Sequence, residues 1–164
     1  MRDLYADKTK AYMKELAERG EYQIGEEELA RIKNDFTGFS CSDEEGAAAI
    51  GKLFKDAGYL MDTHTAIAWA ASDKYLKAAG NAGCKNVVLS TASPYEFTGA
   101  VLAALGEKIS GDDREDMELL SKVSGTEIPG SLSSIFDKEI KHKDIIDVEE
   151  MKSVVVQYAG KGRV

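Results

Sequence analysis

The fold is decided by the stretch Asn86-Val-Val-Leu-Ser-Thr-Ala-Ser-Pro-Tyr-Glu-Phe97, in which an apolar segment runs directly into hydroxyl-bearing residues and a helix start. Asn86 to Ser90 predicts a β-strand, and the Ser93-Pro94 pair predicts the beginning of a helix. In open α/β sheets, ligands bind at the carboxyl ends of strands, beside the N-terminus of the next helix. Ser90 and Thr91 occupy that position, so they are candidate ligand-binding residues.

Helix signals dominate on both sides of this stretch. Ser42 with Glu45, and Ser93 with Glu96, have the spacing of capping boxes, in which a hydroxyl and a carboxylate satisfy each other's backbone amides. Apolar spacing and capping residues predict helices over Asp3–Arg19, Glu26–Asp35, from Ser42 to about Ala57, from an Asp62–Thr65 cap to Gly80, Pro94–Leu105, Asp112–Val123, Ser131–Phe136, and onward from an Asp147–Glu150 cap.

Two of these helices carry notable apolar patterns. Residues 66–71 are apolar on every side, which predicts a helix that is buried all round. In the last helix, Val148, Met151, Val155 and Tyr158 share one face and are expected to point inward.

The strand content is low for an α/β chain. Besides Asn86–Ser90, only Tyr22–Ile24 and Asp144–Ile146 are short strand candidates. A strand as apolar as Val87-Val-Leu89 needs neighbours on both sides. The expected fold class is therefore α/β and helix-rich, with an incomplete sheet of few strands, in a single domain over residues 1–164.

Composition limits the classes of partner. The chain has 164 residues, 43% of them apolar, which suffices for one core. Its net charge of −8 argues against nucleic acid and anionic membrane surfaces. Cys41 and Cys84 lack the spacing of a disulfide framework or zinc site, and no leader or apolar run of about 20 residues is present. We expect a cytoplasmic protein without a bound metal.

Each candidate for chemistry also has a structural interpretation. Ser93 is best explained as a helix cap, whereas the Thr91 hydroxyl would either bind a ligand or bond the turn. His64 lies in the first turn of a helix, where an imidazole acts as acid or base or simply supports the structure. Lys55 in Phe54-Lys-Asp56 falls on the outer face of its helix and is expected to be solvated.

Three linked motifs resemble the C-terminal part of bacterial threonine synthase. They are, in the order and spacing of that family, Gly58-Tyr-Leu-Met-Asp-Thr-His-Thr-Ala66, Val88-Leu-Ser-Thr-Ala-Ser-Pro-Tyr-Glu-Phe97 and Lys141-His-Lys-Asp-Ile-Ile-Asp147. The resemblance runs over nearly the whole chain. It implies the large domain of a fold type II enzyme that uses pyridoxal phosphate (PLP) to convert O-phosphohomoserine and water into threonine and phosphate.

The resemblance also implies roles for individual residues. The threonine of the family's Ser-Thr-Ala-Ser-Pro segment, Thr91 here, is the expected partner of the cofactor's pyridine nitrogen, and Ser90 lies beside it. His64 is a weaker carry-over, as a substrate or supporting residue. The sequence departs from the family at Thr63, where proline is usual, and at Glu96, where lysine is usual.

A larger departure is the absence of the family's Schiff-base lysine and phosphate-binding loop, which lie upstream of the matching region. The resemblance therefore implies a C-terminal fragment that is inactive alone and needs the N-terminal part of the same enzyme. Exposed apolar surface is expected to favour a homodimer of such a fragment. Two alternatives stay open: a helical interaction domain without chemistry, and a module in which Ser90 and Thr91 bind an anion.

Overall fold

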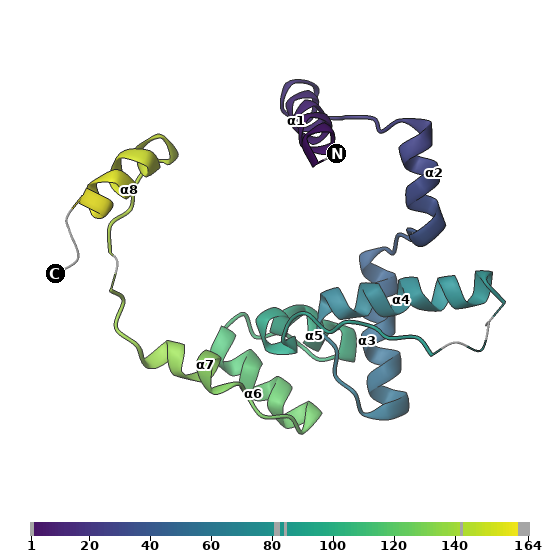
Figure 1. Cartoon of the computed structure of the whole chain (residues 1–164). Coiled ribbons are helices and arrows are strands. Elements are labelled where there is room, and N and C mark those ends of the chain that lie inside the picture. The colour runs from purple at the N-terminus through teal and green to yellow at the C-terminus, as the bar shows by residue number, and fades with distance from the viewer. Residues whose placement is uncertain (1, 81–82, 84, 142, 161–164) are drawn as a thin grey trace. The chain divides into compact units, whose positions relative to one another are not determined.

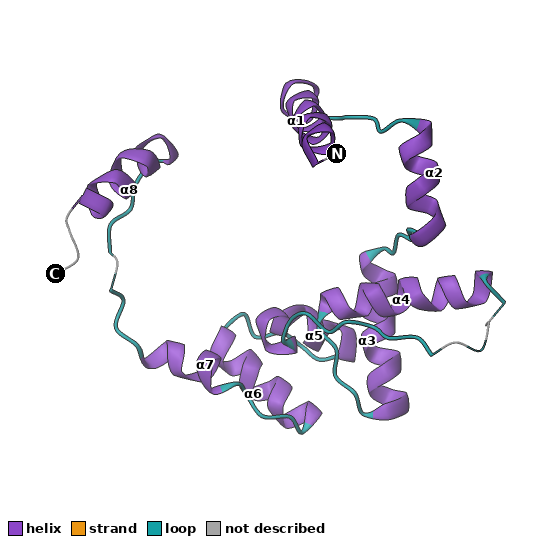
Figure 2. Ribbon diagram, viewed as in Figure 1, coloured by secondary structure: helices purple, strands orange, loops and turns teal. Residues whose placement is uncertain are grey.

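The computed structural model describes residues 2–80, 83, 85–141 and 143–160, and within these ranges its secondary structure is entirely helical (Figures 1 and 2). Cys84 and His142 lie outside the described residues. The elements in chain order are α1 (Arg2–Arg19), α2 (Glu26–Asp35), α3 (Asp43–Ala57), α4 (Thr63–Ala78), η1 (Pro94–Phe97), α5 (Thr98–Leu105), α6 (Asp113–Ser124), α7 (Gly130–Ser133), η2 (Ser134–Asp137), η3 (Val148–Glu150) and α8 (Met151–Gly160), where η marks a 3-10 turn.

The chain divides into two compact units. The first comprises Met1–Ala49 and His64–Thr91, and the second comprises Ile50–Thr63 and Ala92–Val164. That residues 1–164 form a single domain stays a prediction. In the part of the chain that the structure describes, no helix is both long and apolar enough to cross a bilayer.

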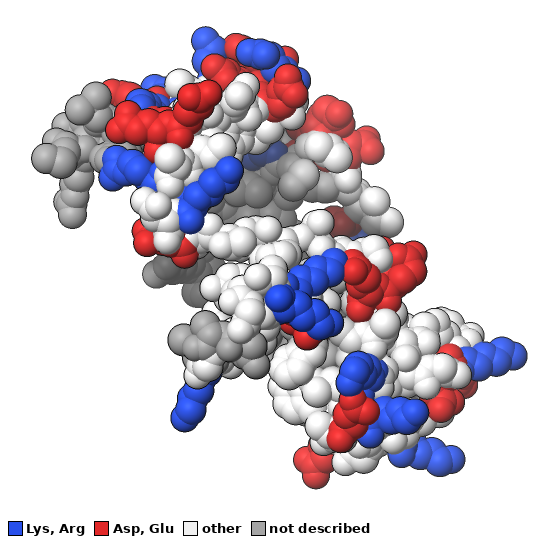
Figure 3. Space-filling view, turned by 90° about the vertical axis from the view of Figure 1, so that its right-hand side faces the viewer, with Lys and Arg blue, Asp and Glu red and all other residues white. Residues whose placement is uncertain are grey.

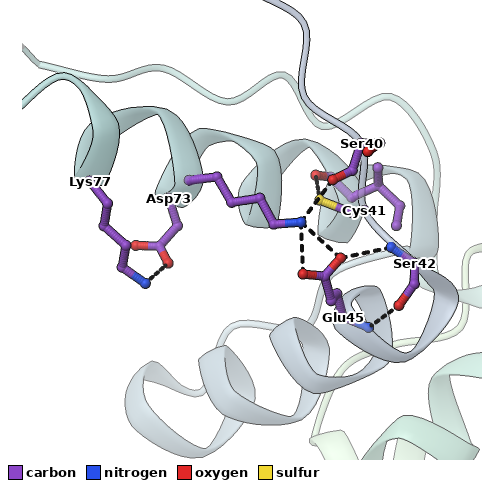
Figure 4. A network of polar contacts seen from close by, with 8 residues as sticks. Ser40, Cys41, Ser42, Glu45, Asp73 and Lys77 are labelled. Carbon is purple, nitrogen blue, oxygen red and sulfur yellow. Dashed lines mark hydrogen bonds and ion pairs between the residues drawn. The ribbon is translucent and has the colours of Figure 1, made fainter.

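In the first unit, a capping box begins α3, as predicted. The Ser42 backbone N–H donates to Glu45 Oε2 at 2.8 Å, and the Glu45 N–H donates to Ser42 Oγ at 3.3 Å (Figure 4). Lys74 of α4 adds an ion pair to Glu45 at 2.7 Å and a bond to the Ser40 carbonyl at 2.8 Å. The hydrogen bond from Lys74 lowers the pKa of Glu45 and raises that of Lys74. This network ties the start of α3 to α4.

In the second unit, α5 packs against α6 around a small apolar core. Its fully buried side chains include Ile50, Met61, Val101, Leu102 and Leu120. Tyr95 is also buried, and its hydroxyl donates to the Thr126 carbonyl at 2.9 Å. This bond joins η1 to the segment that follows α6.

The predicted strands are not formed. Asn86–Ser90, Tyr22–Ile24 and Asp144–Ile146 are irregular, and none of the described residues lies in a β-strand. A strand is stable only when its backbone groups pair with a neighbour. All regular structure among the described residues is helical, so these segments have no ladder partner there.

Two predicted burial patterns are also wrong. The α4 helix is not buried all round, because Trp69 is 42% exposed and Thr65 and Ala66 are its buried residues. The predicted inward face of the last helix is exposed, with Val148 at 77% and Val155 at 65%. An apolar pattern marks the face that a helix will bury, but burial itself requires a neighbour.

The capping box predicted at Ser93 and Glu96 is formed only in part. Ser93 caps η1, but its Oγ accepts from the Tyr95 N–H at 3.3 Å, while the Glu96 N–H donates to the Ser93 carbonyl at 3.0 Å. The tight 3-10 turn after Pro94 replaces the α-helical first turn that a capping box requires. The Asp147–Glu150 box before α8 is formed as predicted.

A buried carboxylate closes the loop before α6. Asp116 is 4% exposed, and its Oδ1 accepts from the Ser110 backbone N–H at 2.8 Å, while Oδ2 accepts from the Gly111 N–H at 3.4 Å. These bonds, and foremost the one from Ser110, hold the pKa of Asp116 below its ordinary value.

Replacing Asp116 with asparagine is expected to cost most stability at neutral pH. Because the folded state lowers the pKa, the ionised carboxylate stabilises the folded chain above its ordinary pKa of about 4. This contribution is lost as pH falls through the lowered value. Circular dichroism melts should show the native midpoint several degrees above that of Asp116→Asn at pH 7, with the gap closing in acid. An equal gap at both pH values would contradict this assignment.

Candidate functional site

The segment that carries Ser90 and Thr91 runs back along α4 (Figure 1). Two side-chain hydrogen bonds hold it there: Thr65 Oγ1 donates to Ser90 Oγ at 3.4 Å, and the Asn86 amide donates to Ser72 Oγ. Thr65 and Ser72 are two helical turns apart, about 10 Å along the axis. A four-residue step from Asn86 to Ser90 spans at most about 13–14 Å, so the chain bridges the two anchors in an open, non-helical form.

Alternate residues of this segment face opposite sides. Asn86 and Ser90 bond α4, and Val88 between them is half-buried. The other set comprises Val87 (79% exposed), Leu89 (74%) and Thr91, which are exposed, as Asn86 and Ser90 also are, but have no side-chain hydrogen bond to a described residue of α4. A period of two is the side-chain pattern of a β-strand. The segment therefore has the side-chain arrangement of the predicted strand without its ladder.

The two hydroxyls of the candidate site differ in what they contact. Ser90 accepts a hydrogen bond from Thr65, whose side chain is 4% exposed, so its hydroxyl holds the segment on α4. Thr91 is exposed and makes no hydrogen bond to another described residue. Of the two, Thr91 is therefore the better placed to meet a ligand.

His64 is exposed in the first turn of α4, where the sequence places it. It is next to Thr65 along the chain, so α4 brings it to the same end of the segment as Ser90. Lys55 is exposed on α3, which confirms the prediction of a solvated lysine. Within the described ranges, no three His, Cys, Asp or Glu side chains are grouped to hold a metal ion.

The structure adds two residues that the sequence interpretation missed. Thr65 and Ser72 are the anchors of the segment on α4, and neither was a candidate. Their spacing of seven places two hydroxyls on one face of the helix. That pattern, combined with the polar residues at positions 86 and 90 of the predicted strand, could have revealed the contact.

Charged side chains of both signs occur along the whole sequence. Acidic and basic residues are interspersed over the face drawn in Figure 3, with wide neutral areas between them. Exposed ion pairs such as Lys14–Glu18 and Lys77–Asp73 contribute little to stability. The side chains of the candidate site and its neighbours are hydroxyl groups, at Ser90 and Thr91, and apolar groups, at Val87 and Leu89.

The sequence and the fold of this chain match those of one enzyme family. A family model described as "Threonine synthase, C-terminal" matches residues 65–155, which is more than half of the chain. The chain belongs to this threonine synthase C-terminal family. The matched range contains most of α4, the segment with Ser90 and Thr91, and most of the second unit.

Characterised relatives agree with this assignment. The threonine synthase of Saccharomyces cerevisiae is 26% identical over 156 residues, which cover 92% of this chain and 28% of the yeast protein. The human protein "Threonine synthase-like 1" is 32% identical over 106 residues, which cover 62% of this chain and 14% of the human protein.

Solved structures show the same fold. The crystal structure of yeast threonine synthase matches with a TM-score of 0.69 and 25% identity, over 95% of this chain and 30% of that one. The PLP-bound threonine synthase of Brucella melitensis matches with a TM-score of 0.65 and 23% identity, over 97% and 29%. The chain thus spans less than a third of the length of either enzyme.

Proposed function

We propose that this chain forms the C-terminal portion of a threonine synthase that uses PLP to make threonine and phosphate from O-phosphohomoserine and water. The single observation that carries the proposal is the family match, which includes the hydroxyl segment at residues 90–91. The cofactor, when bound, supplies the electron sink for this chemistry. The scaffold would be that of the fold type II enzymes, with its sheet completed by the rest of the enzyme.

In this proposal Thr91 contacts the pyridine nitrogen of the cofactor. Its exposed hydroxyl, without a hydrogen bond to another described residue, fits a single polar contact of this kind. A neutral hydroxyl leaves a ring nitrogen less firmly protonated than a carboxylate would. Ser90 is a second candidate contact, but its bond to Thr65 favours a supporting role, and His64 is proposed only to lie near the substrate.

The remaining contacts of the cofactor come from elsewhere in the enzyme. The lysine that bonds PLP and the loop that binds its phosphate are assigned to the N-terminal part of the parent protein. The isolated chain is therefore inactive, and PLP added to it gives no stoichiometric visible absorbance band. A stoichiometric band that is lost on Lys55→Ala would contradict this division of the site.

A chimeric enzyme tests the role of Thr91. The region of yeast threonine synthase that this chain matches is replaced by this chain, and threonine formation from O-phosphohomoserine is measured. Thr91→Val should lower kcat by about 10- to 100-fold, the range expected for one hydrogen bond to a charged or strongly polar group. Thr91→Ser should retain most activity, because it keeps the hydroxyl.

The matched control is Lys55→Ala, which removes an exposed lysine and should leave kcat unchanged. A folded, PLP-loaded chimera that makes no threonine would contradict the proposed function. Equal activity of Thr91→Val and the unsubstituted chimera would remove Thr91 from the site while leaving the family assignment intact.

A further inference from the structure

Tyr95, four residues after Thr91 in the chain, uses each of its polar groups in a hydrogen bond. Its backbone N–H donates to Ser93 Oγ at 3.3 Å, and its carbonyl accepts from the Thr98 hydroxyl at 2.8 Å. Its own hydroxyl donates to the Thr126 carbonyl at 2.9 Å and lies 2.8 Å from Thr126 Oγ1. The residue is 4% exposed. Tyr95 is therefore held at three points, two of them local and one on the segment that follows α6.

The receiving residue, Thr126, is itself tied to the end of α6. Ser121 Oγ donates to the Thr126 carbonyl at 2.7 Å, and the Thr126 N–H donates to Ser124 Oγ at 3.2 Å. Gly125 adopts a φ of 71°, and its N–H donates to the Ser121 carbonyl at 2.9 Å. Such a left-handed residue is a common end of an α-helix. The Tyr95 hydroxyl therefore meets a hydrogen-bonded turn that α6 holds in place.

The packing of α5 on α6 does not need this hydroxyl. Val101 and Leu102 of α5 and Leu120 of α6 are fully buried, and a phenylalanine would supply the same apolar ring as Tyr95. Apolar contacts are non-directional, whereas a hydrogen bond depends on direction as well as distance. The hydroxyl thus adds a directional contact at η1, which is where the chain arrives from Thr91.

Thr91 lies between two anchored residues of the chain. Ser90 on one side accepts a hydrogen bond from α4, and Ser93 on the other accepts from the Tyr95 N–H. The Pro94 ring fixes one further backbone angle between Ser93 and Tyr95. Two residues span at most about 7 Å, so the position of Thr91 is limited by that of Ser93.

We propose that Tyr95 is a positioning residue, whose hydroxyl, held by Thr126, restricts where the Thr91 hydroxyl stands for its contact with the cofactor. This inference rests on the proposed function. The Thr91 hydroxyl makes no hydrogen bond to another described residue, so its placement depends on the backbone on either side. A functional group needs neighbours that lock its position, and a misplacement of about 1 Å can cost about 100-fold in rate.

NMR relaxation of the isolated chain tests this restraint without the cofactor. The backbone order parameters of residues 91–93 should be about 0.85, as for a rigid backbone, and should fall below about 0.6 in Tyr95→Phe. Thr126→Val should lower the same order parameters by a smaller amount, because the Thr126 carbonyl remains as an acceptor. Tyr158→Phe is the matched control, since it removes the exposed hydroxyl that donates to Asp144 Oδ2 at 3.5 Å and should change none of these values.

The yeast chimera described above tests whether Tyr95 acts through Thr91. Tyr95→Phe should lower kcat by about 10-fold, because the Thr91 hydroxyl is still present but less well placed. Tyr95→Phe combined with Thr91→Val should be no slower than Thr91→Val alone, since the hydroxyl to be positioned is already absent. Losses that multiply would overturn the action through Thr91, because a purely structural role of Tyr95 predicts independent effects.

The two kinds of measurement separate this inference from the proposed function. Unchanged order parameters at residues 91–93 in Tyr95→Phe would overturn the positioning role, whether or not the chimera is active. Lowered order parameters together with a folded, PLP-loaded chimera that makes no threonine would overturn the proposed function and leave the restraint by Tyr95 in place. Lowered order parameters with a non-multiplying loss of kcat would support both.

Discussion

Replacing Leu102 with alanine is expected to lower the free energy of unfolding by about 3 kcal/mol, within the 2–5 kcal/mol usual for leucine-to-alanine changes in a core. Leu102 is fully buried in α5, which packs on α6, so truncation removes apolar contacts and leaves a cavity. Among the residues that the structure describes, the buried leucines are Leu102 and Leu120, so each contributes a large share of the stability. Urea unfolding followed by circular dichroism measures the change.

The control for Leu102 is Leu89→Ala. Leu89 is 74% exposed, so its truncation should change the stability of the isolated chain by no more than about 0.5 kcal/mol. Equal losses for both variants would mean that the small core of the second unit does not determine the stability measured.

The second large effect is expected for Gly51→Ala. Alanine is a better helix former than glycine by about 1 kcal/mol, so propensity alone predicts that this change in α3 stabilises the chain. However, a Cβ at position 51 would lie 2.8 Å from the Ala104 backbone carbonyl oxygen of α5. Backbone cannot move aside as a side chain does, so we expect a net loss of about 1–3 kcal/mol, as for other overpacked sites.

Gly46→Ala in the same helix is a matched control for the sign of this effect. Its Cβ would lie 2.9 Å from Ile67 Cδ1, the flexible end of a side chain that turns away at small cost. Thermal melts should therefore rank Gly51→Ala below Gly46→Ala. The reverse order would show that the approach of α3 and α5 at Gly51 is looser than the structure indicates.

Helix boundaries were the most predictable part of this fold, because they depend on neighbouring residues. The α2 helix spans the predicted residues, and the reciprocal bonds of Ser42 and Glu45 begin α3 as the capping pattern indicates. At Ser93 the same pattern was misleading, since Pro94 opens a 3-10 turn and moves the serine bond to Tyr95. Whether the 3-10 turn forms depends on how η1 packs. A four-residue sequence pattern carries no information about that packing.

Strands and buried faces were less predictable, because both depend on groups that are distant in sequence. The strand pattern at Asn86–Ser90 correctly indicates alternation, yet the ladder that would define a strand is missing. The apolar face of α8 is equally clear in sequence and is also exposed, as Val155 shows. Both patterns indicate that these residues are suited to pairing or burial, but not whether a neighbouring element is present.

Thr91 illustrates what the sequence provided for the candidate site. The resemblance selected the residue, and the structure then distinguished it from Ser90 through the bond between Ser90 and Thr65. Such a distinction cannot be made from two adjacent hydroxyls in sequence, because which of them faces α4 depends on the register of the segment along that helix.

The segment from residue 86 onward also has a consequence for the solubility of the polypeptide. Residues 87–93 contain neither a charge nor a proline, and Val87 and Leu89 are largely exposed. Uncharged, strand-prone runs of this length are the segments from which ordered aggregates grow. Lys85 before it and the strong negative charge of the whole chain act as gatekeepers, so solubility during synthesis depends on electrostatic repulsion that acid or high salt would weaken.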